Sequence, residues 1–139
     1  MNLVDVQFLM AELTSGIEGA RAEVGLTDRP RHNDAYLRLT SLYDPEVYAI
    51  VSTDGAGTYD LTVAGEFSIG MADDQALDPE SVRGYLESYV RAALAYLDGH
   101  WSIRASTIFK VPILTIQNDV ARLHLVSRGR VSLNTGPRF

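Results

Sequence analysis

The stretch DPESVRGYLESYVRAALAYLDG, residues 78–99, contains the best-specified structural element of the chain. Asp78 suits the N-cap position, Pro79 suits the first helical position, and Glu80 places a carboxylate near the positive end of the helix dipole. Apolar residues then recur at steps of three and four, as on one face of a helix, at positions 82, 85, 86, 89, 90, 93, 94 and 97. An Asp-Gly pair ends the pattern. The sequence therefore predicts an amphipathic helix over residues 79–97.

The residues before this helix predict short strands joined by tight turns. Alternating apolar residues and turn signals favour strands over residues 35–43, 47–52, 59–63 and 66–71, the fourth being either separate or a continuation of the third around a bulge. Between the second and third strands, TDGAGT (53–58) has the glycines of a hairpin loop. The polar residues 27–34 predict a connector. Hairpins spaced this closely indicate an antiparallel meander.

The N-terminal segment predicts another helix, over residues 3–25. Asn2 suits its N-cap, and a stripe of apolar residues recurs with helical spacing along the segment. Gly16 and Gly19 weaken the prediction, since a glycine in a helix interior costs ~1 kcal/mol relative to alanine. The stripe suits a helix that packs across a sheet, and it also suits a coiled-coil dimer.

Three further strands are expected after the central helix, over residues 101–109, 111–116 and 121–126, with a short strand at 131–133 before a flexible tail from about residue 134. The expected element order is α-β-β-β(-β)-α-β-β-β. This order predicts an α+β fold in one domain, residues 1–139, with a single antiparallel sheet of about six or seven strands and two helices packed on one face. The second face is then solvated, curved into a half-barrel or covered by a partner.

The composition is that of a globular chain, because 46% of its 139 residues are hydrophobic and 22% are charged. The chain has no cysteine, which excludes disulfides, thiolate metal sites and thiol nucleophiles. The N-terminus lacks the basic region of a signal peptide, and no apolar run approaches the ~20 residues of a membrane span. We therefore expect a cytoplasmic protein without membrane contact. The formal net charge of −6 disfavours nucleic acid as a partner.

No catalytic, cofactor or metal site is predicted. The three histidines, His32, His100 and His124, do not stand at metal-ligand spacings, and the sequence has neither a GxSxG nucleophile elbow nor a Walker-type phosphate loop. The glycine-rich DGAGT lies between two predicted strands and lacks the helix N-terminus that binds phosphate. These absences favour a binding protein over an enzyme.

Carboxylates concentrate just before and at the start of the central helix. Three interpretations stay open: a solvated loop with a helix cap, a surface that recognises a basic partner, and a weak cation site whose spacing is not that of an EF-hand. Tyrosine is enriched at interfaces, and the tyrosines of the predicted strands, Tyr59 among them, either line the open face of the sheet or take core or half-buried sheet positions. The candidate partner-binding residues are Asp73, Asp74, Asp78 and Glu80, together with Asp54 and Tyr59 in and after the predicted hairpin loop.

Three functional hypotheses follow. The first is a non-catalytic cytoplasmic protein that binds and masks another protein, as a bacterial toxin-immunity inhibitor or a secretion chaperone does, its acidic surface speeding encounter with a basic target. The second is a small-molecule-binding protein or an enzyme, with a pocket between the sheet and helix 79–97. The third is a structural or assembly subunit that dimerises through helix 3–25 or a sheet edge. The chain is accordingly expected to be a monomer or a homodimer.

Overall fold

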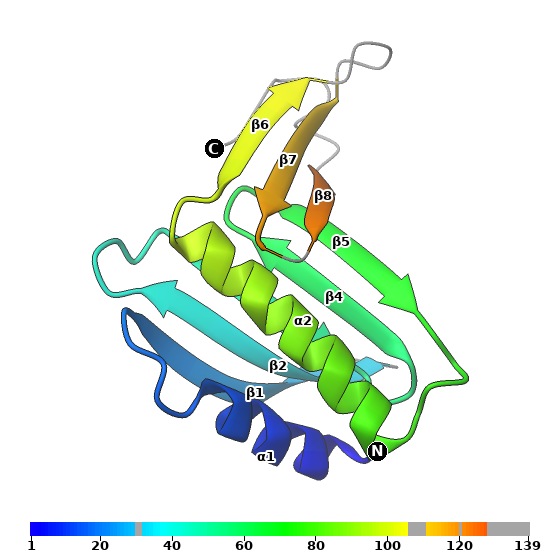
Figure 1. Ribbon diagram of the computed structural model, residues 1–139. Helices are drawn as coiled ribbons and strands as arrows, with labels where there is room; N and C mark the ends of the chain where they lie inside the picture. The colour runs from blue at the N-terminus through cyan, green and yellow to red at the C-terminus, as the bar shows by residue number, and fades with distance from the viewer. Residues whose placement is uncertain (30–31, 106–110, 120, 128–139) are drawn as a thin grey trace.

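The computed structural model describes residues 1–29, 32–105, 111–119 and 121–127 and shows an α+β fold (Figure 1). Its two helices are α1 (Leu3–Thr14) and α2 (Pro79–Leu97). The strands of its single sheet are β1 (Ala20–Arg29), β2 (His32–Ser41), β3 (Tyr48–Thr53), β4 (Thr58–Val63), β5 (Phe67–Ala72), β6 (Trp101–Ala105), β7 (Pro112–Gln117) and β8 (Arg122–Ser127). The bounds of α2 are those predicted from its caps and apolar face. Asp78 accepts a hydrogen bond from the Ser81 amide at its N-terminus.

The eight strands form one antiparallel sheet in the order β1-β2-β3-β4-β5-β8-β7-β6. β1 to β5 make a continuous meander, and α2 then carries the chain across the sheet to β6 at the far edge. The last three strands return as a second meander, which joins the first, among the described residues, through two residue pairs, Phe67 with Ser127 and Ser68 with Val126. Figure 1 shows these three strands rising away from the first meander.

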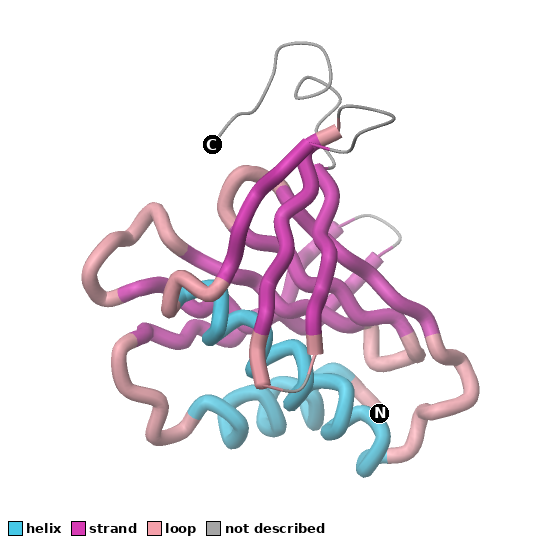
Figure 2. Tube along the Cα trace, turned by 45° about the horizontal axis from the view of Figure 1, so that its top comes forward, coloured by secondary structure: helices cyan, strands magenta, loops and turns pink. Residues whose placement is uncertain are grey.

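Both helices cover the same face of the sheet (Figures 1 and 2). α2 crosses β2, β3 and β4 and reaches β7, whereas α1 packs over β1 and β2 and touches α2 along one side. In β3 and β4 every second side chain is buried beneath the helices, so Val51 and Leu61 are inaccessible while Ile50 and Thr62 on the other face are partly exposed. The face of α2 that is turned toward the sheet contributes Val82, Leu86, Val90 and Ala93 to the same core.

The other face of the sheet carries polar and aromatic side chains. Tyr36, Arg38 and Tyr48 lie there, all partly exposed, and the Arg38 guanidinium stands 4.3 Å from the centre of the Tyr48 ring. Cation–π contacts of this kind add to cross-strand pairing between neighbouring strands. This face is therefore only partly buried, in contrast to the helix-covered one.

The predicted helix over residues 3–25 is wrong beyond Thr14. Gly16 and Gly19 have φ angles of 82° and 86°, which fall in the left-handed region that glycine favours, and they end the helix. The following residues form β1, which pairs along its whole length with β2. The apolar residues from Ala20 to Leu26 also alternate with a period of two, and this signal competed with the helical stripe.

This error explains why the sheet has eight strands instead of six or seven. The predicted connector 27–34 is also wrong, because residues 27–29 and 32–34 belong to the β1–β2 hairpin. A coiled-coil dimer through helix 3–25 loses its basis, since α1 has 12 residues. Residues 106–109 of the predicted strand 101–109, the strand at 131–133 and the tail from 134 lie outside the described residues. Within the described parts of the chain, no helix is long and apolar enough to cross a membrane.

The central position of β4 gives a direct stability test. Leu61→Ala removes a completely buried side chain in the middle of the sheet, and we expect the free energy of unfolding to fall by about 3 kcal/mol. Thr62→Ala, one residue along on the opposite face, is the matched control and should change it by less than about 1 kcal/mol. Urea unfolding followed by circular dichroism measures both. Equal losses would contradict the one-sided core.

Candidate functional site

Three segments that are distant in the sequence meet at the N-terminal end of α2. The Asp73 amide donates a hydrogen bond of 2.7 Å to the Gly57 carbonyl, which joins the β5–α2 loop to the β3–β4 loop. The N-terminal ammonium of Met1 donates to the Gly55 carbonyl at 3.3 Å. Gly57 has a φ of 106°, and a Cβ there would lie 2.6 Å from the Asp73 carbonyl, so this close approach requires glycine.

This junction brings most of the candidate partner-binding residues together. We call the surface the acidic end and define it by Asp5 of α1, Asp54 of the β3–β4 loop, Asp73, Asp74 and Asp78 of the β5–α2 loop, and Glu80 of α2. Five of these six carboxylates were candidates from the sequence, and Asp5 joins them because α1 begins beside the same loops. Their proximity depends on tertiary structure, since residues 54 and 73 lie far apart in the chain.

Local hydrogen bonds fix Asp54 and Asp78 in place. Asp54 accepts from the amides of Ala56 and Thr58 at 2.8 and 3.1 Å, which shapes the turn between β3 and β4. Asp78 accepts from the Ser81 hydroxyl and amide at 2.7 and 3.1 Å, and these bonds lower the pKa of its carboxyl group. These bonds therefore fix the orientation of both side chains.

Asp73 connects the acidic end to a cluster of tyrosines. Its carboxylate accepts a hydrogen bond of 2.5 Å from the Tyr85 hydroxyl and another of 3.1 Å from the Gln75 amide. The Tyr85 hydroxyl is the largest cause of the lowered pKa of Asp73, and the same bond raises the pKa of Tyr85 because it favours the protonated phenol. A charge-assisted bond of this kind ties the loop to α2.

Tyr59 lies beneath this surface. Its ring centre is 4.9 Å from that of Tyr85 and 6.5 Å from that of Tyr89, whose ring meets it edge-on. The side chain is 1% exposed, and burial raises the pKa of its phenol. A partner cannot reach Tyr59 without moving its neighbours, so this candidate supports the acidic end from below. Its buried hydroxyl has no hydrogen-bond partner among the described residues.

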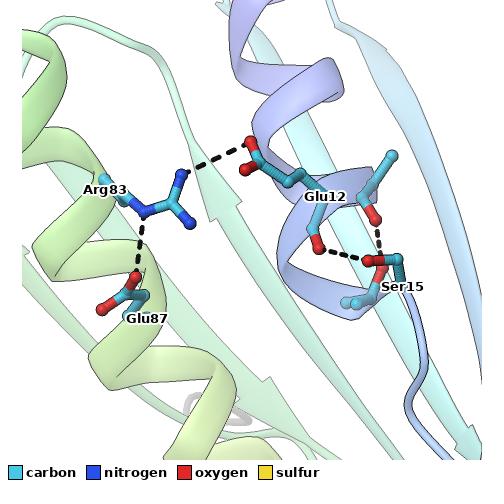
Figure 3. A network of polar contacts seen from close by, with 6 residues as sticks. Glu12, Ser15, Arg83 and Glu87 are labelled. Atoms are coloured by element: carbon cyan, nitrogen blue, oxygen red, sulfur yellow. Dashed lines mark hydrogen bonds and ion pairs between the residues drawn. The ribbon is translucent and has the colours of Figure 1, made fainter.

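A hollow of about 420 Å³ adjoins the acidic end, between α1 and the start of α2. Phe8 projects beside it with 73% of its surface exposed. Arg83 also borders the hollow, and Figure 3 shows its guanidinium bridging the two helices, at 3.3 Å from Glu12 of α1 and 3.0 Å from Glu87 of α2. The complete lining consists of Met1, Asp5, Phe8, Leu9, Glu12, Pro79, Glu80 and Arg83.

Sequence reasoning missed Phe8. The apolar stripe of α1 contains Val6 and Met10, which are buried, whereas Val4 and Phe8 lie four residues apart on the opposite, exposed face. Two large apolar residues on the polar side of an amphipathic helix are a signal that was available in the sequence. Such residues mark a surface that excludes water when a partner binds.

One described hollow, of about 330 Å³, lies between the C-terminal half of α2 and the β7–β8 turn, at one end of the interface where a pocket was predicted. Along the rest of this interface the described side chains that α2 turns toward the sheet are buried in the core. Other described hollows lie outside the interface. One of about 440 Å³ lies at the opposite end of the molecule, beside His100 and Trp101, where the Trp101 ring stacks on Tyr96 at 5.4 Å. No group of three or more His, Asp or Glu side chains in the described part of the chain is arranged to hold a metal ion.

Comparisons of the chain with protein-family models, with curated proteins and with solved structures found no match.

The Tyr59 hydroxyl generates a stability prediction. Tyr59→Phe removes a buried polar atom that has no hydrogen-bond partner among the described residues while keeping the ring contacts with Tyr85 and Tyr89, so we expect unfolding to cost about 1 kcal/mol more. Tyr85→Phe, which loses the bond to Asp73, is the opposite case and should destabilise the protein. Chemical denaturation measures both variants. A loss of stability in Tyr59→Phe would contradict the unpartnered hydroxyl.

Tyr89 generates a pH prediction. Burial raises the pKa of its phenol from the ordinary value of 10.0 to about 12. Between these values the unfolded chain loses its Tyr89 proton while the folded chain keeps it, so stability is fully present below about pH 10 and is lost as the pH rises toward about 12. Urea unfolding at pH values from about 8 to about 11.5 should show this fall. Tyr89→Phe should make it smaller, and an unchanged fall would exclude Tyr89 as a cause.

Proposed function

We propose that the chain is a non-catalytic, cytoplasmic binding protein that masks a basic surface of another protein, in the manner of a bacterial toxin-immunity inhibitor or a secretion chaperone. The observation that carries this proposal is the acidic end, where six carboxylates from α1, two loops and the first turn of α2 lie beside an exposed phenylalanine. Such a combination of charge and apolar surface is typical of a recognition site for a protein.

The charge of the acidic end supports fast association with a cationic target. Asp73 and Asp78 have lowered pKa values, so they stay ionised at neutral pH. Asp5, Asp74 and Glu80 add exposed carboxylates on the same side. Complementary potentials of this kind raise association rates and suppress wrong partners more than they add affinity.

The hollow beside Phe8 supplies the apolar contribution. The recess is lined by Phe8 and by several carboxylates. It therefore suits an aliphatic or aromatic side chain of the partner that is flanked by lysine or arginine. The Arg83 bridge holds α1 against α2, so the recess keeps its shape before binding. A preformed recess lowers the ordering cost of association.

A tagged pull-down from the source organism, read by mass spectrometry at low and at ~0.5 M salt, tests the proposal. Asp74→Lys/Glu80→Lys reverses two exposed charges of the acidic end, and we expect it to weaken binding of the captured partner at least about tenfold. Glu18→Lys/Glu46→Lys makes the same change of charge at exposed sites on the opposite end and should leave binding within about twofold. Binding of the purified partner is measured by calorimetry.

Phe8→Ala separates the apolar contribution from the electrostatic one. It should weaken binding to a similar extent at low and high salt, whereas the loss from the double charge reversal should shrink as salt rises. Capture of no stoichiometric protein partner at low salt would overturn the proposal. A partner whose affinity ignores both the charge reversal and Phe8→Ala would show that it binds elsewhere.

A further inference from the structure

β1 is an edge strand of unusual length for its position. It stands first in the strand order and pairs with β2 from Ala20 to Arg29, so its outer side has no neighbouring strand within the described residues. An uncovered edge offers a row of backbone donors and acceptors to another strand, and proteins usually shorten or cover such edges. Among the described residues, no strand pairs with the outer side of β1, where alternate residues direct their backbone N–H and C=O groups.

The side of β1 that faces the helix layer is apolar and only partly covered. Ala22 and Leu26 are exposed on this side, Leu26 by 49% of its surface, although α1 packs over β1 and β2. Val4 of α1 is 56% exposed. An incoming strand would therefore find small and aliphatic side chains along one face of this edge.

The opposite side of β1 carries charges of both signs. Arg21 and Glu23 are exposed and stand two residues apart, hence on the same face of the strand. The Tyr36 ring covers Gly25 beside them, and its hydroxyl donates to the Glu23 carboxylate at 3.5 Å. A purely basic or purely acidic partner strand would meet one like charge at this edge, whereas a strand with the same two residues in the reverse order would meet none.

We propose that a second copy of this chain pairs with β1 in antiparallel fashion, about a two-fold axis that passes beside Ala22. In this register Arg21 lies opposite Glu23 of the second copy, and Glu23 lies opposite Arg21 of the second copy. Cross-strand pairs of opposite charge stabilise a sheet, and the symmetry provides two of them. The sheet then continues through both copies as sixteen strands, with all helices on one face.

Other registers are less favourable. If the axis passes beside a residue, that residue pairs with its own copy and the helices of both copies lie on the same face of the sheet. Shifting the pairing by one residue would turn every side chain of one copy to the other face. An axis beside Glu23 would place the two Glu23 carboxylates opposite each other. An axis beside Val24 would leave Arg21 and Glu23 opposite uncharged residues. An axis beside Leu26 would place Glu23 opposite Arg29 of the second copy but would leave Arg21 opposite a position beyond the end of β1. The pairing about Ala22 is the register that matches both Arg21 and Glu23.

The helix layer has room for this arrangement. In each copy α1 lies above the boundary between β1 and β2. Neighbouring strands are spaced by ~4.8 Å, so the axes of the two copies of α1 would be about 10 Å apart, one on each side of the line where the two β1 strands pair. Packed helices are usually separated by ~8–10 Å. The two copies of α1 would therefore meet without displacing either strand.

A charge swap tests the register. Arg21→Glu and Glu23→Arg each place two pairs of like charges across the seam, and we expect each to weaken dimerisation at least about tenfold. Arg21→Glu/Glu23→Arg restores opposite charges and should recover the dissociation constant of the unchanged protein to within about threefold. Sedimentation equilibrium from about 1 to about 100 µM at low salt measures all four proteins. Asp74→Lys/Glu80→Lys, at the acidic end, should dimerise normally, so the proposed function and the dimer fail separately.

A second measurement covers the case in which a variant is unstable, since Glu23 also lies opposite Arg38 within the chain. Hydrogen exchange of the unchanged protein should slow at the outward amides of residues 20–24 as the concentration rises, while exchange in β4 stays constant. A monomer at about 100 µM would overturn the proposal. So would a dimer that both single variants leave intact, or exchange in β1 that does not depend on concentration.

Discussion

The structure depends on burying one face of a single sheet beneath α2. Val51 in β3 and Leu61 in β4 are fully buried under Leu86 and its neighbours, while the intervening side chains point to the other face. Because side chains alternate, a slip of one residue would move this apolar set into solvent, so the register of the whole meander is determined here. The positions of the β3–β4 and β5–α2 loops follow from that register, and the acidic end is their meeting point.

The sequence was sufficient where local signals agreed. The caps, the first-turn acid and the apolar face of residues 79–97 all favour a helix, and α2 has these bounds. Between residues 15 and 29 two signals disagreed, since the same apolar residues fit a helical stripe and a period of two. The positive φ angles of Gly16 and Gly19 favour a chain reversal there, and pairing with β2 then favours the strand. That pairing is a long-range interaction, which a reading of local periodicity does not include.

The candidate site, too, could be predicted from the sequence only in part. Composition alone identified the carboxylates of residues 73–80, but their contact with the β3–β4 loop depends on a hydrogen bond between residues 57 and 73. From the sequence, Tyr59 could line the open face of the sheet or lie in the core, and the alternation of side chains along β4 places it in the core beneath the helix. Phe8 lies outside the buried stripe of its helix, so the periodicity that predicts the helix does not include it. An apolar residue outside the stripe of an amphipathic helix carries as much information as one within it.

The six carboxylates of the acidic end do not all have the same explanation. Asp54, Asp73 and Asp78 each accept hydrogen bonds that shape a turn, anchor a tyrosine or cap a helix, so the fold alone accounts for their presence. Asp5, Asp74 and Glu80 are exposed, and their proximity to the other three adds like-charge repulsion that the fold must tolerate. Asp5 and Glu80 stand in the first turns of α1 and α2, where a carboxylate favours the helix dipole, so Asp74 is the member of the six without an evident structural role. The proposal of a basic partner therefore depends most on Asp74 and on the exposed Phe8 beside the acidic end.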